Sequence, residues 1–239
     1  LTNSKKGIPW FITAIGAFQD AMTVGICASF QYWDYLTEKR KVTKQAEIMP
    51  GFSIPIEVEE DFPIVDKPCC ELISVQRIRF DPAAKWYDVV GTSPYTILEM
   101  PMYLGDVLER MENGYGKEGK PWNNIDKKVL LQARMKDDDP IQQARNERKE
   151  NPDTVTSTVS DFDVIQVHLN FIRSDGKHYA FYSLKDLELL TEPVPLHEMF
   201  PLGEIPITVG FCILETHQAM PRGLSQLGSQ LQQEANEIA

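Results

Sequence analysis

The stretch that decides the fold is LGEIPITVGFCILETHQAMPRGLSQLGSQLQQEANEIA, residues 202–239. Its β-rich residues 205–214 predict a strand, and a short punctuated segment, residues 215–222, leads from that strand into a helix. One stripe of the helix carries apolar residues at steps of three or four, namely Leu224, Leu227, Leu231, Ala235 and Ile238. No Gly, Pro or basic last turn closes it. We therefore expect the chain to be a fragment that ends inside a longer helix.

A second long helix is predicted at the other end of the chain. It starts at Pro9, which suits a first helical turn, and runs to about Arg40. Small and apolar residues recur along one broad face: Trp10, Ala14, Ala17, Phe18, Ala21, Met22, Gly25, Cys27, Ala28, Tyr32 and Leu36. Residues 37–50 begin with a Lys/Arg cluster. We interpret this cluster as complementing the helix dipole rather than as a nucleic-acid patch.

The middle of the chain carries strand signals. They predict a small twisted antiparallel sheet, with strands at residues 52–58, 69–75, 77–80 and 95–100 and connections at 61–67 and 81–94. We interpret Asp81, which precedes a proline, as a turn residue rather than a catalytic acid. Helices are expected at 103–111, closed by Asn113-Gly114, and at 124–135 and 140–150, with a linker at 150–160.

A β-hairpin is the clearest local prediction. Ile165, Val167, Leu169 and Phe171 alternate with polar residues, Asp175-Gly176 makes the turn, and HYAFYSL (178–184) returns. A further short strand is expected at 187–190, and prolines then force an extended path. The fold class is therefore α+β, with long helices packed on small, mostly antiparallel sheets. Three regions are expected: residues 1–50, a long helix and connector; 51–160, β-rich with inserted helices; and 161–239, a hairpin region leading into the truncated helix.

Composition restricts the possible functions. The chain is 42% hydrophobic and 25% charged, as globular proteins are, and no run is apolar enough for a membrane span. Its net charge of −11 argues against a protein that grips nucleic-acid phosphates. Of the four cysteines, Cys69 and Cys70 are adjacent and would point to opposite faces of a strand. We interpret all four as reduced, buried thiols rather than disulfides or metal ligands.

No motif predicts chemistry, so we expect no catalytic, cofactor-binding or metal site. Gly114, Gly119 and Lys120 have phosphate-loop spacing, but Pro121 replaces the required Ser or Thr. The acidic run 137–139 lacks the spacing of a calcium loop. Histidines 168, 178, 197 and 217 have no zinc-site spacing, although His168 and His178 could face each other across the hairpin. A site of carboxylates brought together in space stays open.

Three stretches resemble one family. ILETHQAMPRGLSQLGSQLQQEANEIA (213–239) is similar to the "LG..LQ.E.N.IAN" segment of portal proteins from tailed phages of the podovirus and prophage type. AFQDAMTVGICASFQYWDY (17–35) and CCELISVQRIRFDPAAKWYD (69–88) resemble portal segments in the matching order. The resemblance covers most of the chain and includes no catalytic signature.

The resemblance implies a structural, non-enzymatic role. Such proteins form a ring, usually a dodecamer, at one vertex of the phage head, where a terminase drives double-stranded DNA through the channel. It implies a homo-oligomer that contacts terminase, capsid and tail adaptor proteins, assembled in the bacterial cytoplasm and located in the virion. The helices would pack between neighbours and the β-rich middle would form an outer wing. Two alternatives stay open: an enzyme with a spatially assembled carboxylate or histidine site, and a bacterial scaffold protein unrelated to phage.

Overall fold

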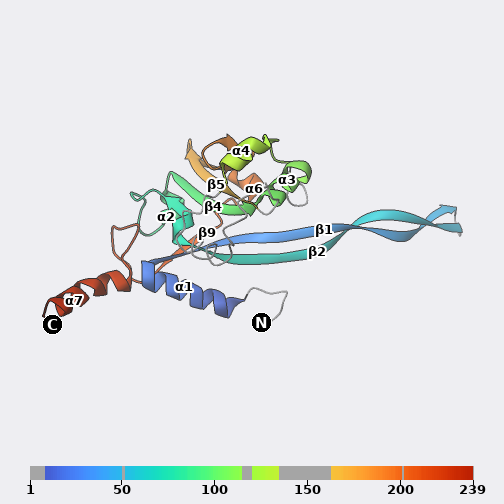
Figure 1. Ribbon diagram of the computed structural model, residues 1–239. Coiled ribbons are helices and arrows are strands. Elements are labelled where there is room, and N and C mark those ends of the chain that lie inside the picture. The colour runs from blue at the N-terminus through green and yellow to red at the C-terminus, as the bar shows by residue number, and fades with distance from the viewer. Residues whose placement is uncertain (1–8, 50–51, 115–119, 135–162, 201, 239) are drawn as a thin grey trace, which may run out of the picture.

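The fold combines two antiparallel β-sheets with a few short helices (Figure 1). This computed structural model describes residues 9–49, 52–114, 120–134, 163–200 and 202–238. One sheet has the strand order β2-β1-β9 and the other β3-β4-β5-β6-β7, with β8 paired to β6. The predicted α+β class and the antiparallel pairing are confirmed. The N-terminal helix is shorter than the sequence suggested, whereas the closing helix, at residues 224–238, lies where it was predicted.

The first helix, α1 (Trp10–Val24), ends 16 residues earlier than predicted, and the rest of the expected helix is the strand β1 (Ile26–Met49). The helix stops at Gly25, whose φ of 96° lies in the left-handed region and whose N–H caps the carbonyl of Ala21. Beyond it, burial alternates with a period of two, because Ile26, Ala28 and Phe30 face the core. The prediction of a helix to Arg40 is therefore wrong. Apolar residues at helical spacing suggested it, but beyond Gly25 the two-residue alternation of a strand decides the structure.

Strand β1 pairs with β2 (Phe52–Ile73) along almost its whole length. The register runs from Ala28↔Ile73 to Met49↔Phe52, with a bulge between Leu36 and Thr37. Residues 61–67, predicted as a connection, lie inside β2. The basic cluster at 37–44 therefore lies on a strand opposite acidic residues, and the interpretation as a helix-dipole partner is wrong. The last strand, β9 (Ile207–Phe211), pairs with the base of β1 at 26–30 and confirms the strand predicted near residue 205.

The second sheet contains the predicted hairpin. Its strands are β3 (Ile78–Phe80), β4 (Tyr95–Tyr103), β5 (Val164–Ser174), β6 (Lys177–Leu184), β7 (Glu188–Leu189) and β8 (Val194–Pro195). The turn between β5 and β6 has positive φ at both Asp175 and Gly176, as an Asp-Gly hairpin turn requires.

The other helices are short. They are a 3₁₀ turn η1 (Val75–Arg77), α2 (Val89–Thr92), α3 (Leu104–Asn113), α4 (Lys127–Gln132), α6 (Leu196–Met199) and α7 (Leu224–Ile238). Gly114 caps the C-terminal end of α3 as predicted, and its N–H donates a hydrogen bond to the carbonyl of Arg110. Asp81 accepts a hydrogen bond from the N–H of Ala83 through its carboxylate, which confirms its turn role.

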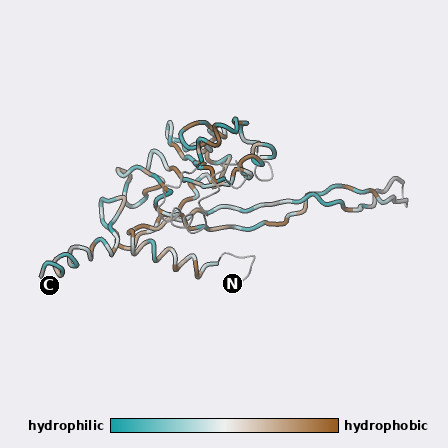
Figure 2. Tube along the Cα trace, in the orientation of Figure 1, coloured by the Kyte–Doolittle hydropathy of each residue, from teal (hydrophilic) through white to brown (hydrophobic). Residues whose placement is uncertain are grey.

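One face of the second sheet carries both hydrophobic clusters. Toward one end it packs on the paired bases of β1, β2 and β9, through Ile26, Phe30, Ile73, Leu98, Leu169, Phe171 and Ile207. Toward the other end it packs on α3 and α4, through Leu104, Val107, Trp122, Leu130, Ile165, Val167 and Leu184. The opposite face is the more polar one. Figure 2 shows apolar residues concentrated in this body and on α1.

Some predictions fall outside the described residues. These are the helix at 140–150, the acidic run 137–139, the linker at 150–160 and most of the glycine-rich segment at 114–120. None of the described helices combines the length and apolarity that crossing a membrane requires.

Candidate interaction surfaces

The outer face of α1 leaves large apolar side chains uncovered. It consists of Phe11, Ile12, Ile15, Phe18 and Met22, and Ile12 and Phe18 are 72% and 68% exposed. A surface helix of a monomer normally turns such residues inward. A contiguous apolar patch of this kind marks an interaction site.

The inner face of α1 is made of small residues that let the helix lie close to the β1–β2 sheet. Ala21 is its buried residue. A Cβ atom added at Gly16 would lie 2.8 Å from Cδ1 of Leu72 on β2, closer than real Cβ atoms approach. The large side chains of α1 therefore cannot turn toward the body without separating the helix from the sheet.

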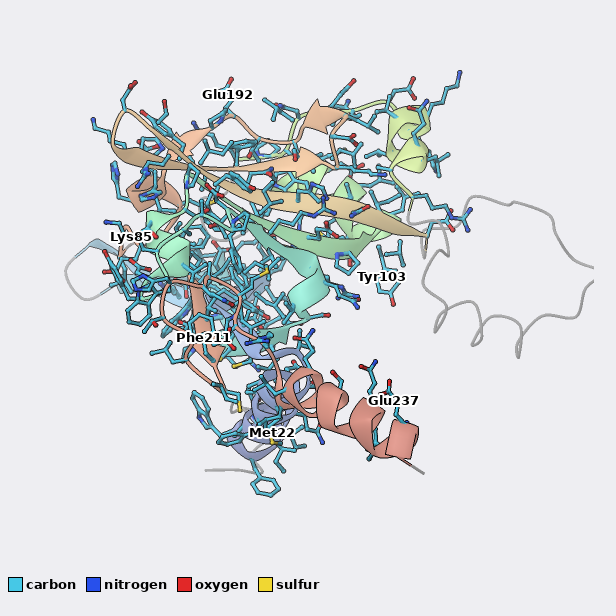
Figure 3. The ribbon with its side chains drawn as sticks, turned by 90° about the vertical axis from the view of Figure 1, so that its left-hand side faces the viewer. Met22, Lys85, Tyr103, Glu192, Phe211 and Glu237 are labelled. Carbon is cyan, nitrogen blue, oxygen red and sulfur yellow. The ribbon has the colours of Figure 1, made fainter. Side chains whose placement is uncertain are left out.

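A tight crossing fixes α1 relative to α7. A Cβ at Gly25 would lie 2.8 Å from the backbone nitrogen of Gly223, and one at Gly223 would lie 2.8 Å from the carbonyl carbon of Thr23. The Ser225 hydroxyl donates a hydrogen bond to the Thr23 carbonyl at 2.6 Å. Figure 3 shows Met22 on α1 and Glu237 on α7 at one end of the view, with Glu192, in the connection between β7 and β8, at the opposite end.

The distal part of the β1–β2 hairpin, residues 31–49 and 52–70, projects away from this body, and we call it the arm (Figure 1). At about 3.3 Å per residue, its 19-residue β1 segment reaches roughly 60 Å. An isolated two-stranded ribbon is marginally stable in water at best. The arm also exposes large apolar side chains. Val42, Ile56, Val58 and Phe62 lie on one face, and Trp33 lies on the other face, nearer the body. These features are typical of a segment that is covered in an assembly.

The opposite face of the arm is charged, and the two signs lie on different strands. Lys39 and Lys41 of β1 lie directly opposite Asp61 and Glu59 of β2. The apolar face has ionic contacts too, because Lys44 pairs with Glu60 and the Arg40 guanidinium lies 4.7 Å from the centre of the Phe62 ring. Opposite charges in cross-strand positions stabilise the ribbon by about 0.2–1 kcal/mol per pair.

The polar face of the second sheet carries a second candidate site. Glu99, His168 and Ser183 occupy one cross-strand row on β4, β5 and β6. Their groups are the types found in a nucleophilic triad, but each has other contacts. Glu99 pairs with Arg79 and accepts a bond from Gln166 at 3.0 Å. No hydrogen bond joins these three described side chains, so the row does not have the linked geometry of a nucleophilic triad.

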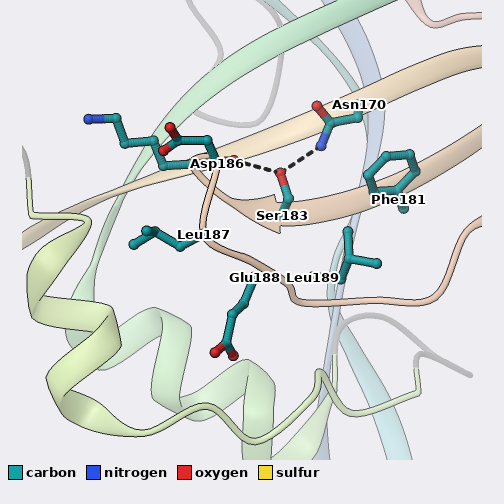
Figure 4. Close-up of a pocket in the computed structure, with 8 residues that line it drawn as sticks. Asn170, Phe181, Ser183, Asp186, Leu187, Glu188 and Leu189 are labelled. Atoms are coloured by element: carbon teal, nitrogen blue, oxygen red, sulfur yellow. Dashed lines mark hydrogen bonds between the residues drawn. The ribbon is translucent and has the colours of Figure 1, made fainter.

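The hydroxyl of Ser183 is held within the sheet. It accepts a hydrogen bond from Asn170 at 2.8 Å and donates one to the carbonyl of Lys185 at 3.0 Å. Both side chains line a shallow, open depression of about 250 Å³ formed with Phe181 and residues 185–189 (Figure 4). These two hydrogen bonds stabilise the β6–β7 turn. We therefore assign the depression no catalytic or binding role.

His168 and His178 do not face each other. Their cross-strand neighbours are Ser183 and Arg173, so they lie at different heights on the hairpin. Burial lowers the pKa of His168, and Nε2 of its ring has no hydrogen-bond partner among the described residues. In the same part of the chain, no three His, Cys, Asp or Glu side chains come together as metal ligands.

All four cysteines are free thiols, as predicted, but none is fully buried. Cys27, Cys69 and Cys70 are half-buried, whereas Cys212 is exposed. Cys69 and Cys70 are paired with successive residues of β1 and so point to opposite faces of the sheet, as expected.

No family model matches this sequence, and no curated protein matches it. We therefore infer function from the uncovered surfaces of the molecule. Sequence reasoning missed the arm, although a signal was available. The three consecutive basic residues 39–41 stand opposite the three consecutive acidic residues 59–61 once the two segments are read as a hairpin.

Proposed function

We propose that this chain is part of the subunit of a portal, the ring-shaped connector at one vertex of a tailed-phage head. The observation that carries the proposal is that one chain has two unlike, uncovered surfaces, the apolar outer face of α1 and the charged, projecting arm. A head-to-tail ring needs two different complementary surfaces per subunit, whereas a twofold dimer uses one surface twice. The three stretches that resemble portal sequences support the same proposal.

The charge of the chain suits a subunit that lets DNA pass. With a net charge of −11, the chain has no excess of Lys and Arg to bind phosphates and release counterions. An acidic wall repels the duplex and lets it slide without sequence-specific contact. In this proposal the terminase, the capsid and the tail adaptor proteins are the other partners, and the virion is the location.

The body supplies a rigid frame for such a subunit. The second sheet, with α3 and α4 on it, packs on the bases of β1, β2 and β9 through fully apolar clusters. Both candidate surfaces extend from this frame and bury little against it. In this proposal the β-rich middle of the chain forms the wing that the resemblance implies, and β1 takes the place of residues 26–40 of the predicted helix.

Electron microscopy of the intact protein, together with sedimentation velocity, tests the proposal. The expected result is a closed ring with a central channel. A stable monomer or a twofold dimer at high protein concentration would overturn it. A gene for a terminase beside the gene for this chain would be independent support.

A further inference from the structure

We propose that the arms of neighbouring copies pair edge to edge, with the basic strand β1 of one copy beside the acidic strand β2 of the next. The result is a continuous antiparallel sheet across subunits. The inference rests on the proposed ring, and it names the contact that would join its members.

Both edges of the arm are open among the residues that the structure describes. Strand β9 covers β1 only at residues 26–30, and the backbone of Gln31 bonds to Pro206 just beyond it. The outer edge of β2 has no partner strand in the described chain. An exposed edge of this length is a template for another strand, and a third strand gives a ribbon the stability that two strands lack.

Two prolines define the segment of β2 whose outer edge can pair with another strand. A proline is accommodated in an edge strand where its nitrogen faces away from the ladder. Pro55 and Pro63, which pair with Gln45 and Thr37, are eight residues apart and therefore share that orientation. Between them lies a seven-residue segment, 56–62, with a full set of backbone donors. Seven residues is an ordinary strand length.

The same segment carries the acidic column. On the charged face, β2 presents Glu57, Glu59 and Asp61, and β1 presents Lys39 and Lys41. All five side chains are exposed. Placing a second arm beside the first in the order β1-β2-β1-β2 puts a basic column on each side of every acidic column. The strands also alternate in direction, as antiparallel pairing requires.

The separation of charge between the strands selects one mode of association. A twofold contact would bring β1 against β1, or β2 against β2, and would set like charges opposite each other, which is destabilising. A head-to-tail contact always brings β2 against β1. The occupant that fits each edge is therefore a second copy of this chain. The same order places the Val42–Val58 pairs of successive arms on one face of the combined sheet.

The test uses two variants of the intact protein. Neither variant should form rings alone, and an equimolar mixture of the two should form them. K39E/K41E gives β1 the acidic charge of the facing residues of β2, and E59K/D61K gives positions 59 and 61 of β2 the basic charge of the facing residues of β1. Each variant loses the same cross-strand pairs within its own arm. Only the contact between copies differs when the two are mixed, because acidic arms then alternate with basic arms. We expect each variant alone to lose its rings and the equimolar mixture to recover them, as counted by electron microscopy and sedimentation velocity.

A third variant covers the case in which single-sign arms do not fold. K39E/K41E/E59K/D61K exchanges the columns and preserves the pairs within each arm. It should form rings alone but exclude tagged wild-type subunits from them. The inference is overturned if both two-site variants form rings alone, if mixing the folded two-site variants fails to restore rings, or if the exchange variant co-assembles freely with wild type. Failure of the wild-type protein to form a ring would instead overturn the proposed function.

Discussion

The hydroxyl of Ser225 donates a 2.6 Å hydrogen bond to the carbonyl of Thr23, 202 positions earlier in the chain. This bond ties the start of α7 to the last turn of α1. Gly25 and Gly223 lie on either side of it and pack backbone against backbone. The crossing sets the direction in which α1 presents its apolar outer face.

Adding a methyl group at this crossing should destabilise the fold. In Gly25→Ala the new Cβ meets the backbone near Pro221 and Gly223, and the left-handed φ adds strain. We expect the free energy of unfolding to fall by about 2–4 kcal/mol. Ser225→Ala should cost about 1 kcal/mol, the value of one hydrogen bond. Urea denaturation measures both changes.

The matched control is Gly228→Ala in α7. A Cβ there meets nothing within 4 Å, so the change should be neutral or stabilise the helix by up to about 1 kcal/mol. Equal losses of stability in the Gly25 and Gly228 variants would show that the crossing is not tight.

Polar substitution on the outer face of α1 should weaken assembly without unfolding the subunit. Because Phe18 is 68% exposed, Phe18→Ser should change the stability of the subunit by no more than about 0.5 kcal/mol. Leu104→Ala, at a fully buried site, should cost about 2–5 kcal/mol and serves as the core reference. Thermal unfolding and sedimentation velocity separate the two effects. A large loss of stability in Phe18→Ser would mean that α1 buries this face against its own body.

The second sheet should lose stability in mild acid through His168. Burial is the largest cause of its lowered pKa, and the charge of Arg79 acts in the same direction. Lys185 also lowers this pKa, whereas Glu99 and Asp186 oppose the shift. The unfolded chain therefore binds the proton more strongly, and the free energy of unfolding should fall as the pH drops below the ordinary histidine value of 6.5.

Urea unfolding between pH 7.5 and 5.5 measures this dependence. His168→Gln removes the titrating group, so its stability should vary less with pH than that of the wild type. An unchanged slope would assign the pH dependence to other groups.

The cysteines should react at different rates. Burial raises the pKa of the Cys27 thiol, and the nearby charge of Asp20 adds to the shift, so little thiolate forms at pH 8. Cys212 is exposed. Iodoacetamide followed by peptide mass spectrometry should find Cys212 alkylated well before Cys27. The difference should disappear in denaturant, and equal rates in the folded protein would contradict the burial of Cys27.

Local chemistry made some of the fold predictable from sequence. The Asp175-Gly176 turn and the alternation around it gave the β5–β6 hairpin, and Asn113-Gly114 gave the end of α3, because both depend on neighbouring residues. The arm depends on a register whose paired residues lie up to 39 positions apart, at Gln31 and Cys70. The small residues Ala21, Gly25 and Ala28 recur at helical spacing, which concealed the strand that begins at Ile26. Whether a side chain such as Phe18 is covered depends on tertiary packing, which periodicity does not report.

The uninterrupted course of β1 from the core to the arm gives the arm an adjustable length. Removing one residue from a single strand would invert the facing of every side chain beyond that point. Removing two residues from each strand at matched ladder positions would shorten the arm by about 7 Å and preserve its register. The reach of the subunit can therefore change in discrete steps while Ile26, Ala28 and Phe30 keep their places in the body. In a family of such chains, the hairpin would act as a molecular ruler that evolves independently of the domain holding it.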